Sequence, residues 1–173
     1  AGAAISNKGG ASGPYISTRK IEPGPLYWIY RFDSLAPSTQ GGNIISNSTQ
    51  YDSAQNFVEA NSSGLVVFPA QINGVTEAAL FAGKGGGINP LKVASFPPAS
   101  TNIRPAPSET DRIVIRDNAN RILRYDYPSF AAIPLAGPGA LGGFSTVGRE
   151  PGISSDGEVT AFIGNRGSGE GLF

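Results

Sequence analysis

Residues 104–125 read RPAPSETDRIVIRDNANRILRY: a short apolar segment, a polar turn, a β-branched strand, a second polar turn and another apolar strand. The same order of segments runs through residues 58–81 and again through residues 151–173. Repeats of about 40 to 50 residues that consist of short strands are typical of β-propeller blades. Each small sheet must stack on its neighbours to bury both of its faces.

The spacing of the three copies is equal. Their second strands end at Phe68, Ile115 and Phe162, which are 47 residues apart in each step. A fainter copy begins at the N-terminus. The predicted repeats cover residues 1–45, 51–97, 98–144 and 145–173, the last of them incomplete. The three matched copies, at 51–97, 98–144 and 145–173, are called here the first, second and third repeats.

The composition agrees with an all-β fold and argues against nucleic acid and lipid bilayers as partners. The 173 residues include 24 Gly and 14 Pro, which disfavour long helices. Thirteen basic and thirteen acidic residues cancel, so no net charge attracts nucleic acid. There is no apolar run of about 18 residues, and we therefore expect no membrane insertion.

The turn of the third repeat carries a family motif. Ser154, Asp156 and Gly157 precede a β-branched strand, and this arrangement resembles the blade motif of the TolB-like (WD40-like) β-propeller family. The second repeat departs from the motif at Asp111, and the first repeat has Gly64 at the corresponding place. The resemblance implies that these five turn residues are structural. It also implies propeller architecture without a shared activity.

Blade number leaves three alternatives open. The resemblance implies six or more blades, whereas 173 residues hold fewer than four blades of 47 residues. The first expectation is a partial propeller, with the chain a fragment of a larger protein. The others are a compact ring of four blades of roughly 43 residues each, and a half-ring that oligomerises.

Missing residue types exclude several kinds of chemistry. The chain has no His and no Cys, which removes Ser-His-Asp and Cys-His catalysis and nearly every zinc or copper site. Acidic pairs such as Asp156 with Glu158, or Glu109 with Asp111, fit hairpin turns better than a glycosidase site. The run from Asp117 to Asn120 offers oxygen ligands but lacks the rest of a calcium loop. We expect no catalytic residues, no metal and no cofactor.

Two groups of side chains are candidates for a ligand-binding surface. Five arginines lie between residues 104 and 124, and of these Arg116 and Arg124 are weak candidates for contact with an anionic ligand or a sugar. Trp28 and Tyr30 form the second group, since exposed aromatic rings bind flat, hydrated ligands. Nearly continuous apolarity around Trp28 also fits a strand buried between blades, and acidic neighbours offset the arginines.

The sequence thus predicts a non-catalytic propeller scaffold or binding module. Low charge and abundant Ser, Thr, Asn and Gly favour an exported or cell-surface protein. The expected partner is another protein or a second copy of the chain. Polysaccharide is a further candidate partner. The alternative is a carboxylate-dependent glycoside hydrolase or a lectin-like module.

Overall fold

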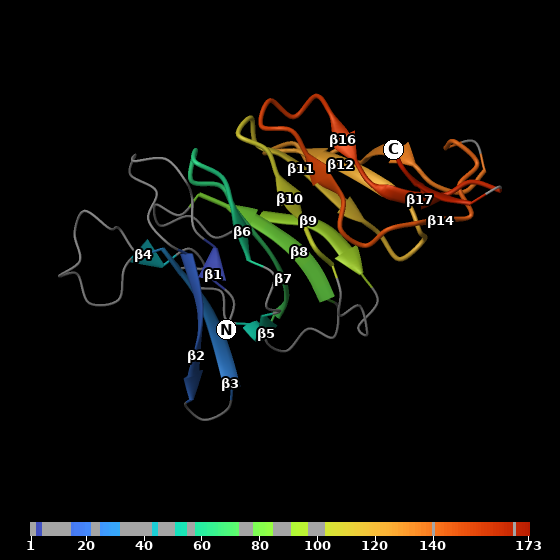
Figure 1. The fold of residues 1–173 in the computed structure, drawn as a ribbon. Coiled ribbons are helices and arrows are strands. Elements are labelled where there is room, and N and C mark those ends of the chain that lie inside the picture. The colour runs from blue at the N-terminus through green and yellow to red at the C-terminus, as the bar shows by residue number, and fades with distance from the viewer. Residues whose placement is uncertain are drawn as a thin grey trace. The chain divides into compact units, whose positions relative to one another are not determined.

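The computed structural model describes short backbone segments before Val58 and most residues beyond it. The described residues are 3–4, 15–21, 25–31, 43–44, 51–54, 58–72, 78–84, 91–96, 103–139, 141–167 and 169–173. Before Val58 and at residues 71–72, only the backbone is described. Every regular element in these ranges is a β-strand, as the arrows in Figure 1 show. The all-β prediction is confirmed for this part of the chain. Nowhere in the same ranges is there a helix long and apolar enough to cross a lipid bilayer.

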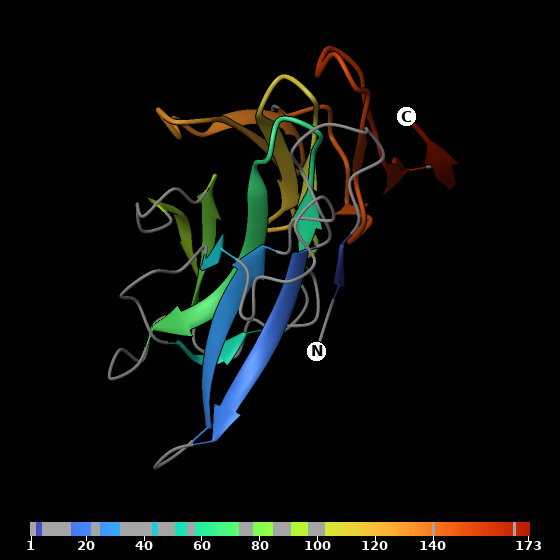
Figure 2. The same ribbon diagram turned by 90° about the vertical axis from the view of Figure 1, so that its left-hand side faces the viewer.

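The chain divides into two compact units, residues 1–101 and 102–173. The first unit holds an antiparallel sheet in the order β1-β2-β3-β5-β7-β8-β9, with β4 beside β3 and β6 beside β7. Its strands are β1 (Ala3–Ala4), β2 (Tyr15–Ile21), β3 (Pro25–Arg31), β4 (Asn43–Ile44), β5 (Tyr51–Ala54), β6 (Glu59–Ala60), β7 (Val66–Ile72), β8 (Ala78–Gly83) and β9 (Leu91–Phe96). β2 and β3 form the long hairpin drawn in blue in Figure 2. One pair, Tyr27 with Tyr51, joins β3 to β5, so that strands of the predicted repeats 1–45 and 51–97 share a sheet.

The centre of the first unit is strand β7. Val66, Val67 and Phe68 are fully buried, and the Phe68 ring stacks on Phe81, its cross-strand partner, with 5.8 Å between centroids. β-Branched and aromatic residues favour extended backbone, and burial on both faces explains why apolar residues follow one another without alternation.

The second unit contains three sheets. They are ordered β10-β11-β12-β13, β14-β17-β18 and β15-β16. The strands are β10 (Ala106–Pro107), β11 (Arg112–Arg116), β12 (Ile122–Asp126), β13 (Ile133–Ala136), β14 (Thr146–Val147), β15 (Gly152–Ile153), β16 (Thr160–Ala161), β17 (Ile163–Asn165) and β18 (Glu170–Leu172). Every strand pair is antiparallel, as expected for propeller blades.

The first and second repeats pair their first two strands in the same register. Glu59 lies opposite Val67, and Ala106 lies opposite Val114. Both members of the second pair are 47 residues beyond their counterparts. The sequence period is therefore a period of strand pairing.

In the third repeat the same pairing recurs with one extra residue. Gly152 lies opposite Ala161. Ala161 is 47 residues beyond Val114, whereas Gly152 is only 46 beyond Ala106. The additional residue therefore lies in the turn between the two strands.

The three residues that defined the period occupy corresponding places. Phe68 lies on β7, Ile115 on β11, and Phe162 between β16 and β17. Each comes one residue after the position opposite the first strand of its repeat.

One face of the β11–β12 hairpin, called here the inter-repeat face, turns toward the third repeat. It carries Arg112, Val114 and Arg116 and their cross-strand partners Asp126, Arg124 and Ile122. The apolar centre of this face packs in a cluster made of Val114, Ile122, Ala136, Phe144 and Val147, with Ile153 and Phe162 against it. The third repeat thus covers one face of the second repeat and buries alternate residues of the second repeat's strands.

Candidate functional site

The first turn of each repeat is closed in the same way. A side-chain oxygen of the first turn residue accepts a hydrogen bond from a backbone N–H at the start of the next strand. The acceptors are Asn61 Oδ1 from Leu65 N (2.9 Å), Ser108 Oγ from Arg112 N (3.0 Å) and Ser154 Oγ from Val159 N (2.9 Å). Asn and Ser are favoured in turns because their short polar side chains bond to nearby backbone.

The fourth turn residue has left-handed backbone in all three repeats. Gly64 has φ of 89°, Asp111 of 63° and Gly157 of 77°. Glycine accepts this conformation without strain, and Asp is among the few other residues that adopt it readily. These three residues therefore occupy equivalent positions in the three hairpins.

Asp156 is held inside the third turn. Its Oδ1 accepts hydrogen bonds from Ser154 Oγ and from the backbone N of Glu158 at 3.0 Å. The bond from Ser154, followed by that from the backbone, lowers the pKa of Asp156 below its ordinary value. A carboxylate stabilised in its ionised form is a poor general acid, and this one is oriented toward its own hairpin.

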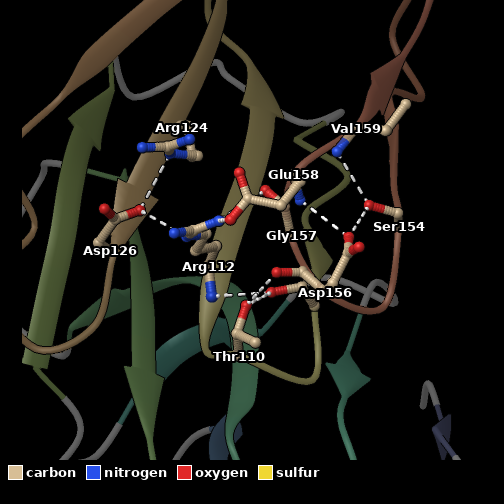
Figure 3. Close-up of polar contacts among 10 residues, drawn as sticks. Thr110, Arg112, Arg124, Asp126, Ser154, Asp156, Gly157, Glu158 and Val159 are labelled. Atoms are coloured by element: carbon tan, nitrogen blue, oxygen red, sulfur yellow. Dashed lines mark hydrogen bonds and ion pairs between the residues drawn. The ribbon is translucent and has the colours of Figure 1, made fainter.

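An inter-repeat polar cluster joins this turn to the second repeat. It consists of Thr110, Arg112, Arg124, Asp126, Asp156 and Glu158 (Figure 3). The Arg112 guanidinium donates from Nη1 to Glu158 Oε1 at 2.5 Å and to the carbonyl oxygen of Gly157 at 3.1 Å. Thr110 Oγ1 donates to the carbonyl oxygen of Asp156 at 2.9 Å. The hydrogen bond to Glu158 raises the pKa of Arg112 above its usual value.

The cluster continues along the inter-repeat face. Arg124 Nε lies 3.1 Å from Asp126 Oδ1, and Arg112 Nε lies 4.0 Å from the same oxygen. Arg124 Nε and Asp126 Oδ1 are both buried. The attraction between their charges therefore offsets the cost of removing each of them from water. Arg124, a sequence candidate for ligand binding, is thus committed to an ion pair.

The other arginines of this region also have protein partners. Arg116 donates to Asn120 Oδ1 at 2.8 Å, and Asn120 in turn bonds to the backbone of Ser145 and Val147. Arg121 pairs with Asp117 at 2.6 Å. The five arginines are therefore distributed along strands and turns, with Arg104 paired to Glu150. They do not converge on one anion site.

Asp117 and Asn120 bear on the calcium interpretation. Asp117 accepts hydrogen bonds from the backbone N and from Nε of Arg121, and the side-chain oxygen Oδ1 of Asn120 accepts one from Arg116. These oxygens close the second hairpin of the repeat. Among the described residues, there is no group of three or more His, Cys, Asp or Glu side chains that could hold a metal ion.

The aromatic candidates lie on β3. The backbone pairs Trp28 with Thr18, and Tyr30 with both Ile16 and Ile44. Their side chains are outside the described part of the chain, so their use as a carbohydrate platform stays a prediction.

The surface that remains is the outer face of the third repeat, defined by Val159, Ala161, Ile163 and Leu172. Val159, Ala161 and Ile163 alternate along one strand with Phe162, and Ile163 lies directly opposite Leu172 on β18. Val159, Ile163 and Leu172 are 64%, 50% and 76% exposed. Thr146, Asn165 and Glu170 form a polar rim around them, because they share the same face of the β14-β17-β18 sheet.

Sequence reasoning did not identify this outer face. The run from Val159 to Ile163 has the near-continuous apolarity of a strand buried on both faces. The available signal was the cross-strand partner Leu172, which lies in a segment rich in glycine and polar residues, where a buried strand is not expected.

Comparison with known proteins addresses the fold. No protein-family model and no curated protein matches the sequence. Among solved structures, the chain is similar to the crystal structure of TolB from Acinetobacter baumannii, with a TM-score of 0.53 and 14% sequence identity. The fold is that of TolB-type β-propeller blades. The match covers 99% of this chain but 39% of TolB, so the chain corresponds to a partial propeller.

Proposed function

We propose that this chain is a non-catalytic binding module built from propeller blades, and that its partner is another protein. One observation carries the proposal. The described carboxylates and arginines that are candidates for chemistry hold turns and repeats together, whereas the outer face of the third repeat exposes apolar side chains.

The concentration of these side chains favours a protein partner. Six large hydrophobic residues are exposed in the described chain, and four of them lie between Val159 and Phe173. Contiguous apolar patches with polar rims are characteristic of protein–protein interfaces, in which water is displaced from apolar surface. Polysaccharide and a second copy of the chain are the other partners to be tested.

Both carboxylates that the hydrolase alternative would use make contacts of another kind. Asp156 bonds to its own turn, and Glu158 pairs with Arg112. An inverting glycosidase needs one carboxyl kept protonated and another free to activate water. The lowered pKa of Asp156 is opposite to the first requirement. The proposal includes export from the cell, which the low charge and polar composition favour.

Affinity capture with matched variants tests the proposal. The immobilised protein is incubated with the extracellular fraction of its source, and retained proteins are quantified, purified and titrated individually. We expect the combined substitutions Val159→Ser, Ile163→Ser and Leu172→Ser to weaken a specific partner by at least about tenfold. Leu135→Ser, at another exposed hydrophobic residue on β13, is the control and should leave binding unchanged.

Two results would contradict the proposed function. One is the retention of the same proteins, with the same affinities, by the wild-type and outer-face variants. The other is glycoside hydrolysis that disappears in Asp156→Asn or Glu158→Gln.

A further inference from the structure

We propose that Asp156-Gly157 is a site of spontaneous aspartate isomerisation, and that contacts with the second repeat keep it unreactive in the folded chain. In this reaction the backbone nitrogen of Gly157 attacks Cγ of Asp156, and the amide proton leaves with the carboxyl hydroxyl group as water. The product is a cyclic succinimide. Water then cleaves the original bond between this nitrogen and the backbone carbonyl carbon, which leaves an isoaspartyl residue. No atom is gained, but the backbone is longer by one carbon.

The sequence of the third turn favours this reaction. Glycine has no side chain to hinder attack by its nitrogen, and Asp156-Gly157 is the one Asp-Gly pair in the chain. The equivalent positions of the first and second repeats hold Ser63-Gly64 and Thr110-Asp111. Of the three turns, the third alone combines a carboxyl side chain with a following glycine.

The fold requires glycine at position 157. Gly157 has left-handed backbone, with φ of 77°, and it is buried. A Cβ added there would lie 2.7 Å from Thr110 Oγ1 and 2.7 Å from Arg112 Cδ, both of which belong to the second repeat. A residue with a side chain therefore does not fit without displacing the second repeat. The labile pair stands where the two repeats pack together.

The peptide group that would react is held on both sides (Figure 3). Its oxygen, that of Asp156, accepts a hydrogen bond from Thr110 Oγ1 at 2.9 Å. Its N–H, that of Gly157, donates to the carbonyl oxygen of Ser154 at 2.9 Å. The reaction removes the proton from this nitrogen and turns the nitrogen toward Cγ. The bond to Ser154 must therefore break, and the bond from Thr110 resists the rotation.

The carboxyl group of Asp156 is held as well. Its Oδ1 accepts hydrogen bonds from Ser154 Oγ and from the backbone N of Glu158. These bonds, that from Ser154 first, lower the pKa of Asp156 and keep its carboxyl group ionised. Loss of water is easier from the neutral acid than from the carboxylate. Ionisation therefore adds to the protection that the backbone contacts provide.

Isomerisation would in turn disrupt the contacts between the repeats. Glu109 N donates to the carbonyl oxygen of Ser155 at 2.9 Å, and Arg112 Nη1 donates to that of Gly157 at 3.1 Å. These two acceptors lie on either side of Asp156. An additional backbone carbon between them changes their separation, so both bonds cannot keep their present geometry. We expect the modified chain to melt at a lower temperature than the unmodified chain.

Peptide mapping of the whole chain measures the reaction. The protein and a synthetic peptide of residues 150–166 are incubated side by side at physiological temperature and neutral pH. The same segment is then released from the protein by trypsin, and its isoaspartyl fraction is followed by mass spectrometry with electron-transfer fragmentation. We expect isomerisation to be at least about tenfold slower in the folded chain than in the peptide, because it requires local opening of the turn.

Matched variants at Thr110 test the protection by the second repeat. Thr110→Val keeps the shape of the side chain but removes its hydroxyl group. It should raise the isomerisation rate about two- to tenfold, as expected for the loss of one hydrogen bond. Thr110→Ser retains a hydroxyl group and should keep the wild-type rate. Deamidation at Asn73-Gly74, measured in the same samples, is the internal control and should be unchanged in both variants.

Three results would overturn the protected isomerisation site. The first is isomerisation of the folded chain as fast as that of the peptide, and the second is a wild-type rate in Thr110→Val. The third is a rise in Thr110→Val that is matched by an equal rise at Asn73-Gly74, since the substitution would then have loosened the whole chain. None of these results depends on the proposed binding function, which is tested on the outer face.

Discussion

The second and third repeats share a pattern of turns and strands but differ in burial. The strand from Arg112 to Arg116 is buried in its three central residues, whereas the corresponding strand from Val159 to Ile163 is exposed at alternate positions. Both strands follow a Ser-capped turn with a left-handed fourth residue. The difference shows that the turn and the strand are local properties, while burial depends on whether another layer covers the face.

The largest expected effect on stability is the difference between truncating a buried isoleucine of the second repeat and an exposed one of the third. Ile113→Ala should lower the free energy of unfolding by about 2–5 kcal/mol, because its fully buried side chain would leave a cavity. Ile163→Ala, at a half-exposed residue, should cost less than about 1 kcal/mol. Urea unfolding followed by circular dichroism measures both. Equal losses would mean that the outer face is covered in solution.

A smaller effect is expected where the third repeat meets the second. A Cβ added at Gly164 would lie 2.7 Å from Phe144 Cδ1. At that distance either the Phe144 ring or the strand that carries residue 164 must shift. Gly164→Ala should destabilise by about 1–3 kcal/mol. Gly152→Ala is the matched control, since its Cβ would meet no atom within 4 Å. If the two variants melt at the same temperature, Phe144 is not packed against this strand.

The ion pair across the repeats should contribute less than these packing contacts. Glu158 is largely exposed, so water and salt screen its attraction to Arg112. A double-mutant cycle with Arg112→Gln and Glu158→Gln should give a favourable coupling smaller than the loss caused by Gly164→Ala. Added salt should reduce the coupling further. A coupling that is independent of salt would indicate a desolvated pair instead.

The smallest effect should be a dependence of stability on pH at the third turn. Because the folded pKa of Asp156 is lowered, the unfolded chain binds its proton more readily. The contribution of Asp156 is therefore complete above the ordinary carboxyl pKa and is lost as pH falls through the lowered value. Melting temperatures of wild-type protein and Asp156→Asn should differ at neutral pH and converge in acid. Ser154→Ala should raise the pKa of Asp156 in a carboxyl NMR titration, and an unchanged pKa would contradict the assigned cause.

Local sequence was sufficient to predict the strands and the turn positions. Val66, Val67 and Ile113 lie in β-branched runs between polar turns, and Gly64 and Gly157 stand where tight turns need left-handed backbone. These features depend on neighbouring residues alone. The 47-residue spacing then identified equivalent positions in separate sheets.

The partners across repeats could not be predicted in the same way. Arg112 and Glu158 are 46 residues apart, and nothing in the local pattern distinguishes a pair between blades from two solvated charges. The same limit applies to the outer face. Apolar alternation shows that Val159 and Ile163 share a face, but it does not show what lies opposite them.

The extra residue in the third turn shows how one repeat can differ from another without disturbing its strands. Ser154 Oγ reaches the backbone N–H of Val159 across five positions, whereas Ser108 Oγ reaches that of Arg112 across four, and strand pairing continues on both sides in each case. Insertion of a single codon within such a turn therefore leaves the in–out phase of both adjoining strands unchanged. It also provides a new side chain, here Glu158, at the seam with the adjacent copy. Repeats of this kind can therefore differ by one residue in their seam contacts while their strands keep the same pairing.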